Sequence, residues 1–411
     1  MAGGFLAVSV APSGVDRLRP AIDGCRPLPT FELDPVWNGL DEPTLAIRTW
    51  RRPDHLNSSL ERSPASLLAS FGSGAESAVS ASHGRADATS DPLGYGALFA
   101  WTGRGIAAVS TRVEALAQLA TAWGEPLRKN LEIAETMAHI GFATAGTTGF
   151  VGVRGVDPDE VVAIHNGALH LSANPEAIEW DRSGRVGSLD DLVEAAAVEL
   201  TDSVERAVSG DGKLVIDLTA GYDSHLVLGA LLHTGAAGDV QFQTVGPSDL
   251  HDVTTARARA AQLGLRHRSG FPYAVPSTGL WERFISNARI TSGMNNPKDG
   301  IREIVAPVAE RRVSGLYGEL LRGSRGPASR AAPAYKRIDG ITRGFGAGRL
   351  GLLNAAATER AAKATAAEVI DLRDPERVAW HAVHRFYARA RLRSRAARLD
   401  DVVPESRHYP L

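Results

Sequence analysis

Seven consecutive residues combine hydroxyl, glycine and carboxylate chemistry between a predicted strand and a predicted helix. They are Leu218, Thr219, Ala220, Gly221, Tyr222, Asp223 and Ser224. The N-terminus of the following helix offers unpaired N–H groups and a partial positive charge, which suit phosphate, and the two hydroxyls add donors. Asp223 would repel a bare phosphate, but it fits a polyphosphate whose charge is bridged by Mg²⁺, because hard cations prefer carboxylate oxygens.

Other interpretations of this segment remain open. It could be a plain strand-to-helix turn in which Asp223 caps the helix. His225, which follows directly, could act as a general base, or it could simply cap or pack. A Walker A motif is absent, since Lys213 is followed by Leu214 rather than by Ser or Thr. The glycine-rich residues 344–348 resemble a dinucleotide fingerprint only loosely, because no clear strand precedes them.

The elements around the loop alternate between strand and helix. Apolar spacing predicts helices over residues 188–208, 226–232 and 253–263, and short apolar runs predict strands over 214–218 and 240–245. This βαβα alternation predicts a parallel sheet flanked by helices, in which ligands bind at the carboxyl ends of the strands.

The first part of the chain has a different pattern. Strands are predicted over residues 5–10, 44–50, 97–101 and 105–110, and helices over 112–123 and 130–139. Asn166 and Gly167 suit the type I′ turn of a hairpin between residues 161–164 and 169–171. Residues 53–93 are dense in Ser, Ala, Gly and Pro, and we expect a long, partly mobile insertion there. A polar break places a domain boundary near residue 185.

Composition excludes several classes of protein. The 411 residues are 44% hydrophobic and 22% charged, which is ordinary for globular domains, and two domains are expected at this length. A net charge of −2 argues against a dedicated nucleic-acid binder, and no long apolar span or signal peptide is apparent. The single cysteine, Cys25, fits a reducing compartment, so we expect a cytoplasmic protein. Cys25 could be a reactive thiol or an inert structural residue.

Residues 218–224 resemble the pyrophosphate loop (Ser-Gly-Gly-x-Asp-Ser) of the asparagine synthetase superfamily, which includes β-lactam synthetases and lasso-peptide cyclases. Thr219 keeps the hydroxyl, and Ala220 replaces a glycine, which adds strain if that position requires a positive φ. Residues 313–323 are similar to the family's second acidic loop: Glu319 matches its second acid, and Gly318 stands where its first acid would be. Residues 147–167, 240–265 and 404–411 fall in the family's order.

The resemblance implies a two-domain α/β architecture. Residues 1–185 would form a degenerate αββα sandwich of the Ntn-hydrolase type, and residues 186–411 a parallel-sheet, PP-loop ATP pyrophosphatase domain that is short at its C-terminus. Glutamine-dependent members use a cysteine directly after the initiator methionine, where this chain has Ala2. We therefore expect no glutamine hydrolysis and a non-catalytic first domain.

The implied reaction activates a carboxylate with Mg-ATP as an acyl-adenylate and then forms an amide with an amine. In that reaction Asp223 and Glu319 would hold Mg²⁺. The nucleotide would contact Leu218, Thr219, Gly221, Tyr222, Asp223, Ser224, Val245, Gly246 and Arg322. Family members use a lysine from more distal helices for amide formation. The candidates to replace it here are Lys336 and Lys298, each of which could equally be an ordinary surface lysine, or a partner chain that supplies the missing part.

The substrates would be a small-molecule or peptide carboxylate and an amine, as in a natural-product pathway, with no nucleic acid and no membrane involved. Two alternatives remain. The departures at Ala220 and Gly318 could mark a non-catalytic pseudoenzyme that scaffolds a partner. A tRNA-thiolating ligase is a third interpretation, against which the lack of a basic surplus and of a second cysteine argues.

Overall fold

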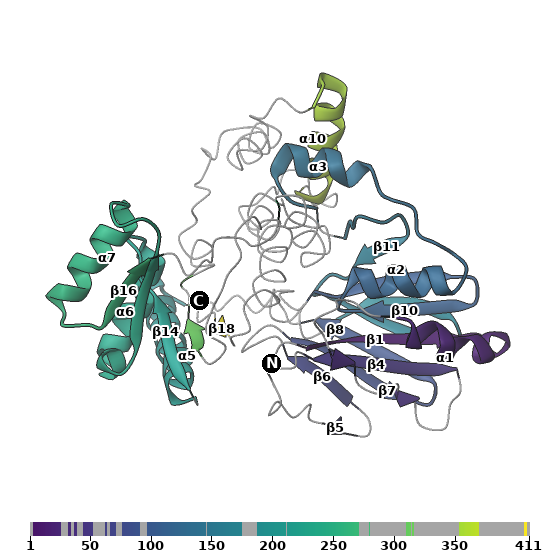
Figure 1. The fold of residues 1–411 in the computed structure, drawn as a ribbon, viewed down its shortest axis with the longest axis horizontal. Helices are drawn as coiled ribbons and strands as arrows, with labels where there is room; N and C mark the ends of the chain where they lie inside the picture. The colour runs from purple at the N-terminus through teal and green to yellow at the C-terminus, as the bar shows by residue number, and fades with distance from the viewer. Residues whose placement is uncertain are drawn as a thin grey trace.

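The computed structural model has a mixed α/β architecture with two antiparallel sheets and one parallel sheet (Figure 1). It describes residues 3–25, 32–33, 37–38, 44–51, 62–63, 66–70, 76–90, 97–144, 146–174, 187–210, 212–270, 279, 310–313, 315, 353–369 and 407–408. Both antiparallel sheets come from residues before 174, and the parallel sheet comes from residues after 212. The domain boundary expected near residue 185 lies outside the described residues.

The first antiparallel sheet has the strand order β11-β9-β10-β1-β4-β2, and β3 also pairs with β4. Its strands are β1 (Gly3–Val10), β2 (Glu32–Leu33), β3 (Trp37–Asn38), β4 (Leu45–Arg51), β9 (Phe99–Gly103), β10 (Ile106–Ser110) and β11 (Val153–Gly155). The strands predicted at 5–10, 44–50, 97–101 and 105–110 are confirmed, with ends that differ by a few residues.

The second antiparallel sheet has the order β13-β12-β8-β7-β6-β5. Its strands are β5 (Arg62–Ser63), β6 (Ser66–Ser70), β7 (Glu76–Ser82), β8 (Arg85–Ser90), β12 (Glu160–His165) and β13 (Ala168–Ala173). The predicted hairpin is confirmed: Asn166 and Gly167, between β12 and β13, have φ values of 48° and 74°, as a type I′ turn requires.

The interpretation of residues 53–93 as a mobile insertion is wrong, because β7 and β8 form the middle of the second sheet. Their inward positions carry small side chains, including Ser77, Val79, Ala81, Ala86 and Ala88, all of which are buried. Alternation of serine and alanine gives a weak strand signal, since neither residue favours strands by itself.

The two antiparallel sheets pack face to face through an apolar layer. Phe5, Ala7 and Ile47 of the first sheet meet Val79 and Ile164 of the second. The opposite face of β1 is also buried, because Leu6, Val8 and Val10 lie under helices. The helices near this sheet are η1 (Pro12–Gly14), α1 (Val15–Asp23), α2 (Val113–Ala122) and α3 (Glu132–Ile140).

The first part therefore has three layers, helices on one sheet and that sheet on the other. Of the expected αββα sandwich, the αββ part is present. A second helical layer over the outer sheet is not found among the described residues, and most of β13 is exposed there.

The parallel sheet has the order β16-β15-β14-β17-β18, so the predicted parallel sheet is confirmed. The strands are β14 (Lys213–Asp217), β15 (Gln241–Val245), β16 (His267–Gly270), β17 (Glu310–Val313) and β18 (Arg407–His408). The helices are α5 (Leu189–Ser209), α6 (Tyr222–His233), η2 (Ala236–Gly238) and α7 (His251–Gln262). The predicted helices and strands of this part are confirmed.

One face of the parallel sheet packs on α5, α6 and α7. Leu214, Ile216 and Leu218 alternate along β14 and beyond its end, and they contact Val204 of α5 and Val227 of α6 within one apolar cluster. A capping box at Ser188 begins α5, where Ser188 and Asp191 satisfy each other's backbone N–H groups. This packing fixes the end of β14 from which the candidate loop departs.

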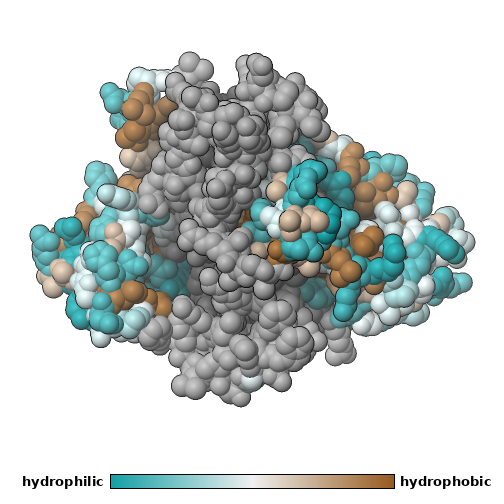
Figure 2. All heavy atoms as spheres, turned by 90° about the horizontal axis from the view of Figure 1, so that it is seen from above, coloured by the Kyte–Doolittle hydropathy of each residue, from teal (hydrophilic) through white to brown (hydrophobic). Residues whose placement is uncertain are grey.

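A helix from late in the sequence packs on the first part of the chain. Figure 1 shows α10 (Ala355–Val369) beside α3, and Arg360 of α10 forms an ion pair with Glu135 of α3. In the visible face of Figure 2, the described surface is mostly hydrophilic, with separate hydrophobic patches. Within the described ranges, no helix has the length and apolar character needed to cross a membrane.

Candidate functional site

The candidate loop leaves the sheet where the strand order changes direction. From β14 the chain runs outward through β15 to β16, and it returns on the other side of β14 as β17. The carboxyl ends of β14 and β17 therefore border a topological switch point, which is where open parallel sheets bind ligands. The loop from Thr219 to Gly221 begins at this edge and leads directly into α6.

Hydroxyl groups hold the loop in shape from inside. The Thr219 N–H donates to Ser224 Oγ at 3.1 Å, and the Gly221 N–H donates to Thr219 Oγ1 at 3.0 Å. The two hydroxyls lie 3.1 Å apart, and Ser224 is only 4% exposed. In this structure both side chains thus hydrogen-bond within the loop and set the backbone path around it.

The first turn of α6 faces the same edge without a side-chain cap. Its N-cap residue is Gly221, which has no side chain to bond the helix N–H groups. Asp223 lies in this turn, where a negative charge complements the helix dipole. His225 Nδ1 donates to the Gly221 carbonyl at 2.8 Å, so the ring contacts the N-cap residue and does not accept a helix N–H as a cap would. Tyr222 is 76% exposed.

A carboxylate from the neighbouring helix also contacts the loop. Asp252, in the first turn of α7, accepts the Ala220 N–H at 3.1 Å. Within the described ranges, positive φ at residues other than glycine occurs only at His83 and Asn166, so Ala220 carries no backbone strain here. The condition under which Ala220 would add strain is therefore not met. Sequence reasoning did not select Asp252, and its place at the start of the second predicted helix was the available signal.

The chain that follows β17 touches the candidate loop directly. A Cβ added at Gly315 would lie 2.7 Å from the carbonyl carbon of Asp223 and 2.8 Å from the Ser224 nitrogen. Residue 315 must therefore be glycine for this close approach. The two segments that the sequence singled out, residues 218–224 and the beginning of 313–323, thus meet at the α6 N-terminus. Further residues of the prediction lie outside the described residues: Glu319, Gly318, Arg322, Lys336 and Lys298.

The strand next to the loop carries the other residues predicted near the nucleotide. Val245 ends β15, and Gly246 follows it with its N–H bonded to the Gly270 carbonyl at 3.2 Å. Leu218 is fully buried, and its carbonyl accepts the Thr244 hydroxyl at 2.6 Å. Val245 and Gly246 therefore lie at the same edge of the sheet as the loop.

The Thr244 hydroxyl has a second partner that sequence reasoning missed. His267 Nε2 lies 2.8 Å from Thr244 Oγ1. Because the hydroxyl hydrogen goes to Leu218, Nε2 must carry the hydrogen of this second bond. Burial, and then the nearby Arg257 charge, lower the pKa of His267, which favours the neutral ring. A histidine in a short edge strand gives no sequence signal of such a contact.

Cys25 is structural rather than reactive. It is 1% exposed, and its Sγ donates to the Ala21 carbonyl at 3.2 Å. Burial raises the pKa of the thiol to about 12, against a smaller opposing effect of Arg48. The thiolate that nucleophilic chemistry requires is therefore scarce. This outcome agrees with the second of the two interpretations of Cys25.

A preformed cage of protein ligands for a metal is not found in the described part of the chain, where no group of three His, Cys, Asp or Glu side chains comes together. Of the two predicted metal ligands, only Asp223 is described. One carboxylate beside a helix N-terminus fits Mg²⁺ that arrives with a polyphosphate, since Mg²⁺ keeps water and phosphate oxygens among its ligands.

Comparisons with known proteins give distant structural similarities alone. No family model matches the chain, and no curated protein matches it. Among solved structures, it is similar to glutamine phosphoribosylpyrophosphate amidotransferase from B. subtilis, complexed with ADP and GMP. The identity is 10% and the TM-score 0.25, over 76% of this chain and 81% of that one.

A second solved structure, described as the allosteric regulatory enzyme of purine biosynthesis, shows the same identity of 10% and TM-score of 0.25, over 62% of this chain and 69% of that one. At such a TM-score, neither similarity supports an inference about this chain.

Proposed function

We propose that this chain binds Mg-ATP at the loop before α6 and uses it to activate a carboxylate by adenylation. One observation carries the proposal: at the switch point of a parallel sheet, Gly315 packs against the backbone of Asp223 and Ser224. Close contact between these two loops is what a shared phosphate and metal site requires. The resemblance of residues 218–224 to the asparagine synthetase pyrophosphate loop supplies the reaction class.

The residues at this edge fit a magnesium polyphosphate. The uncapped first turn of α6 presents backbone N–H donors and the positive end of the helix dipole. Thr219 and Ser224 hydrogen-bond to each other within the loop, and neither side chain caps the helix N-terminus. Asp223, with Glu319 from the second loop, would hold Mg²⁺, which when bound offsets the negative charge of the phosphates.

The chain's own groups would act by positioning and by electrostatic stabilisation. The loop donors hold the β- and γ-phosphates, so that a substrate carboxylate oxygen can attack the α-phosphorus. The bond from the α-phosphorus to the bridging oxygen breaks, and pyrophosphate leaves with the electron pair, held by the same donors. An amine then attacks the acyl carbon, loses a proton and displaces AMP. Lys336 is the candidate for assisting this second step.

The first part of the chain would have no catalytic role in this proposal. Its single cysteine, Cys25, is buried within the helix-covered core, where it cannot act as a nucleophile for glutamine hydrolysis. The amine would therefore come from a substrate. We place the enzyme in a biosynthetic pathway of the cytoplasm that joins carboxylates to amines.

Hydroxylamine trapping tests the reaction class. The protein, Mg-ATP and a library of carboxylic acids are incubated with hydroxylamine, which converts acyl-adenylates to hydroxamates. We expect AMP, pyrophosphate and one hydroxamate in equal amounts, all of which are lost with Asp223→Ala. Glu199→Ala, on an exposed part of α5, is the control and should behave as the parent. Release of ADP and phosphate, or no hydroxamate from any acid, would contradict the proposal.

A further inference from the structure

Four polar side chains form a continuous row across the parallel sheet, directly before the candidate loop. Arg312 of β17 donates to Asp217 Oδ1 from Nε at 2.9 Å and from a terminal nitrogen at 2.6 Å. Gln243 of β15 donates to the same oxygen at 3.2 Å. Arg268 of β16 donates to Gln243 Oε1 at 2.9 Å and 3.3 Å. We call these four residues the sheet row.

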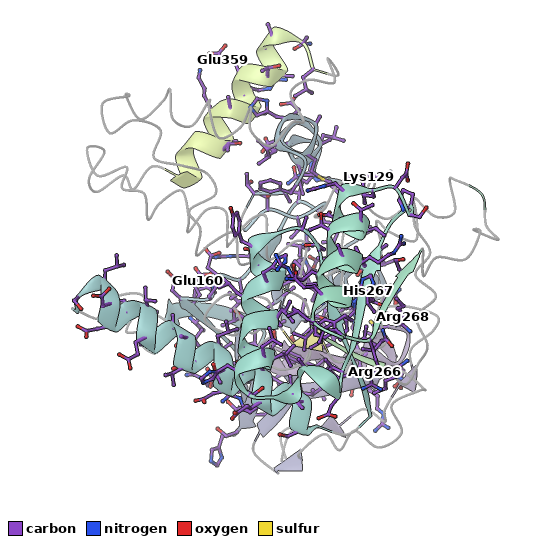
Figure 3. All side chains as sticks on the ribbon, turned by 90° about the vertical axis from the view of Figure 1, so that its left-hand side faces the viewer. Lys129, Glu160, Arg266, His267, Arg268 and Glu359 are labelled. Atoms are coloured by element: carbon purple, nitrogen blue, oxygen red, sulfur yellow. The ribbon has the colours of Figure 1, made fainter. Side chains whose placement is uncertain are left out.

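The sheet row lies on the face of the sheet opposite to α5, α6 and α7. Alternation along β14 places Leu214 and Ile216 on the helix-packed face, so Asp217 points the other way. Arg312 is nevertheless only 8% exposed, and Gln243 is 6% exposed. Arg268 lies at one end of the row, on the edge strand β16, and Figure 3 labels it next to His267. Alternation along β16 turns His267 to the opposite face. Arg312 and Gln243 are thus buried, whereas the Asp217 side chain is 21% exposed.

The register shows that the row is directed toward the site. Arg312 is paired with Val215, but its guanidinium reaches two residues further along β14 to Asp217. Asp217 is the last residue of β14, two positions before Thr219. Arg312 is three positions before Gly315, which packs on the α6 N-terminus. The ion pair therefore joins the two strand ends from which the two loops of the switch point depart.

The chemistry of the row favours a role beyond sheet stability. A buried ion pair adds little net stability compared with apolar residues of similar size, because both charges lose their hydration. What it does fix is geometry, since a guanidinium fork and a carboxylate accept few alternative arrangements. Asp217 receives donors from both sides of the switch point, Arg312 from one and Gln243 from the other.

We propose that Asp217 is a positioning residue, which fixes residues 219–224 and Gly315 relative to each other by holding Arg312 and Gln243 on one carboxylate oxygen. The consequence for nucleotide affinity rests on the proposed function. The consequence for the order of the two loops does not, and it can be measured on the protein without nucleotide.

Hydrogen–deuterium exchange on the full chain tests the positioning role. Asp217→Asn removes the charge of the carboxylate on which Arg312 and Gln243 converge. We expect exchange about tenfold or more faster in peptides covering residues 217–226 and 310–316, with α5 and the antiparallel sheets unchanged. Asp87→Asn, which breaks an exposed ion pair with Arg85 on β8, is the control and should leave both peptides as in the parent. Unchanged or uniformly faster exchange would overturn the proposal.

A second variant separates positioning from stability. In the double variant Asp217→Leu with Arg312→Met, both charges of the ion pair are removed together, so thermal stability should recover to that of the parent or above. We expect the two loop peptides to remain fast and Mg-ATP affinity to remain reduced. Recovery of loop protection together with stability would show a merely structural pair. If the parent itself fails to bind Mg-ATP, the proposed function fails, while the exchange result still decides the role of Asp217.

Discussion

Replacing Gly315 by alanine would add a Cβ where the first turn of α6 already lies. The added atom would be 2.7 Å from the Asp223 carbonyl carbon, 2.8 Å from the Ser224 nitrogen and 2.9 Å from the Asp223 oxygen. All three neighbours are backbone atoms at the start of a helix, so no side chain can rotate away. Either the segment after β17 or the α6 N-terminus must move.

The expected cost follows from overpacking by one methyl group. Extra atoms in a packed region destabilise proteins by about 1–3 kcal/mol. Because the displaced atoms belong to the proposed nucleotide site, a similar penalty should appear in Mg-ATP binding. A loss of about 1.4 kcal/mol weakens affinity roughly tenfold. We therefore expect Gly315→Ala to unfold more readily and to bind Mg-ATP about tenfold or more weakly.

Gly229→Ala provides a matched control on α6. A Cβ added at Gly229 meets nothing within 4 Å, and the residue lies inside the helix. Alanine is a better helix former than glycine by about 0.5–1 kcal/mol, so this variant should be more stable and bind Mg-ATP as the parent does. Chemical unfolding and calorimetric titration of the three proteins decide the matter. If Gly315→Ala unfolds and binds as the parent does, the close approach of the two loops is refuted.

Three further results are expected. Asp252→Ala should weaken Mg-ATP binding in calorimetry. Asp252→Asn should retain most of the affinity, because the amide oxygen of asparagine can still accept the Ala220 N–H. Equal losses of affinity in the two variants would show that this hydrogen bond is not the cause. Since burial raises the pKa of Cys25 from 9.0 to about 12, its stabilising effect is complete below pH 9.0 and is lost as the pH rises. In urea unfolding, the free energy of unfolding should decrease less steeply with rising pH for Cys25→Ala than for the parent. An equal decrease in the two proteins would contradict this assignment. Burial and the Arg257 charge lower the pKa of His267, so the stability of the protein should fall as the pH drops below 6.5. Thermal unfolding measured against pH should show a smaller fall for His267→Gln. An equal fall in the parent and the variant would contradict this assignment.

Residues 188–263 of the parallel-sheet part could be predicted from the sequence because their signals are local and agree with one another, whereas β16, β17 and β18 were not predicted. The apolar residues of β14, the glycine-containing loop and the apolar stretch of α6 each indicate the same βαβ arrangement. The position of the loop at the carboxyl edge then follows from the topology of parallel sheets. Most boundaries differed by one or two residues, but α6 begins at Tyr222, four residues before its predicted start.

Apart from the β12–β13 hairpin, the second antiparallel sheet could not be predicted, because β7 and β8 use Ser and Ala where most strands use branched or aromatic residues. Ala86 and Ala88 are buried only because the opposite sheet offers Phe5 and Leu45 to fill the space. Such complementarity between distant segments leaves no local pattern. A short turn at His83 and Gly84, both with positive φ, was the available hairpin signal.

Some residues around the loop could be selected from the sequence, and others could not. The loop itself has a motif, but Asp252 and Asp217 act through bonds to residues far away in sequence. A carboxylate at the start of a helix commonly serves as a cap. The residue type alone therefore does not mark either aspartate as part of a functional site. The partner that gives each of them a role becomes visible only when the strands are placed side by side.

Calorimetric titration with Mg-ATP tests the central claim most directly. The parent, Asp223→Ala and the control Glu199→Ala are compared after circular dichroism has established that each is folded. We predict binding by the parent and by Glu199→Ala, with dependence on Mg²⁺, and loss of binding by Asp223→Ala. Absence of binding by the folded parent, or equal binding by Asp223→Ala, would contradict a nucleotide site at the α6 N-terminus.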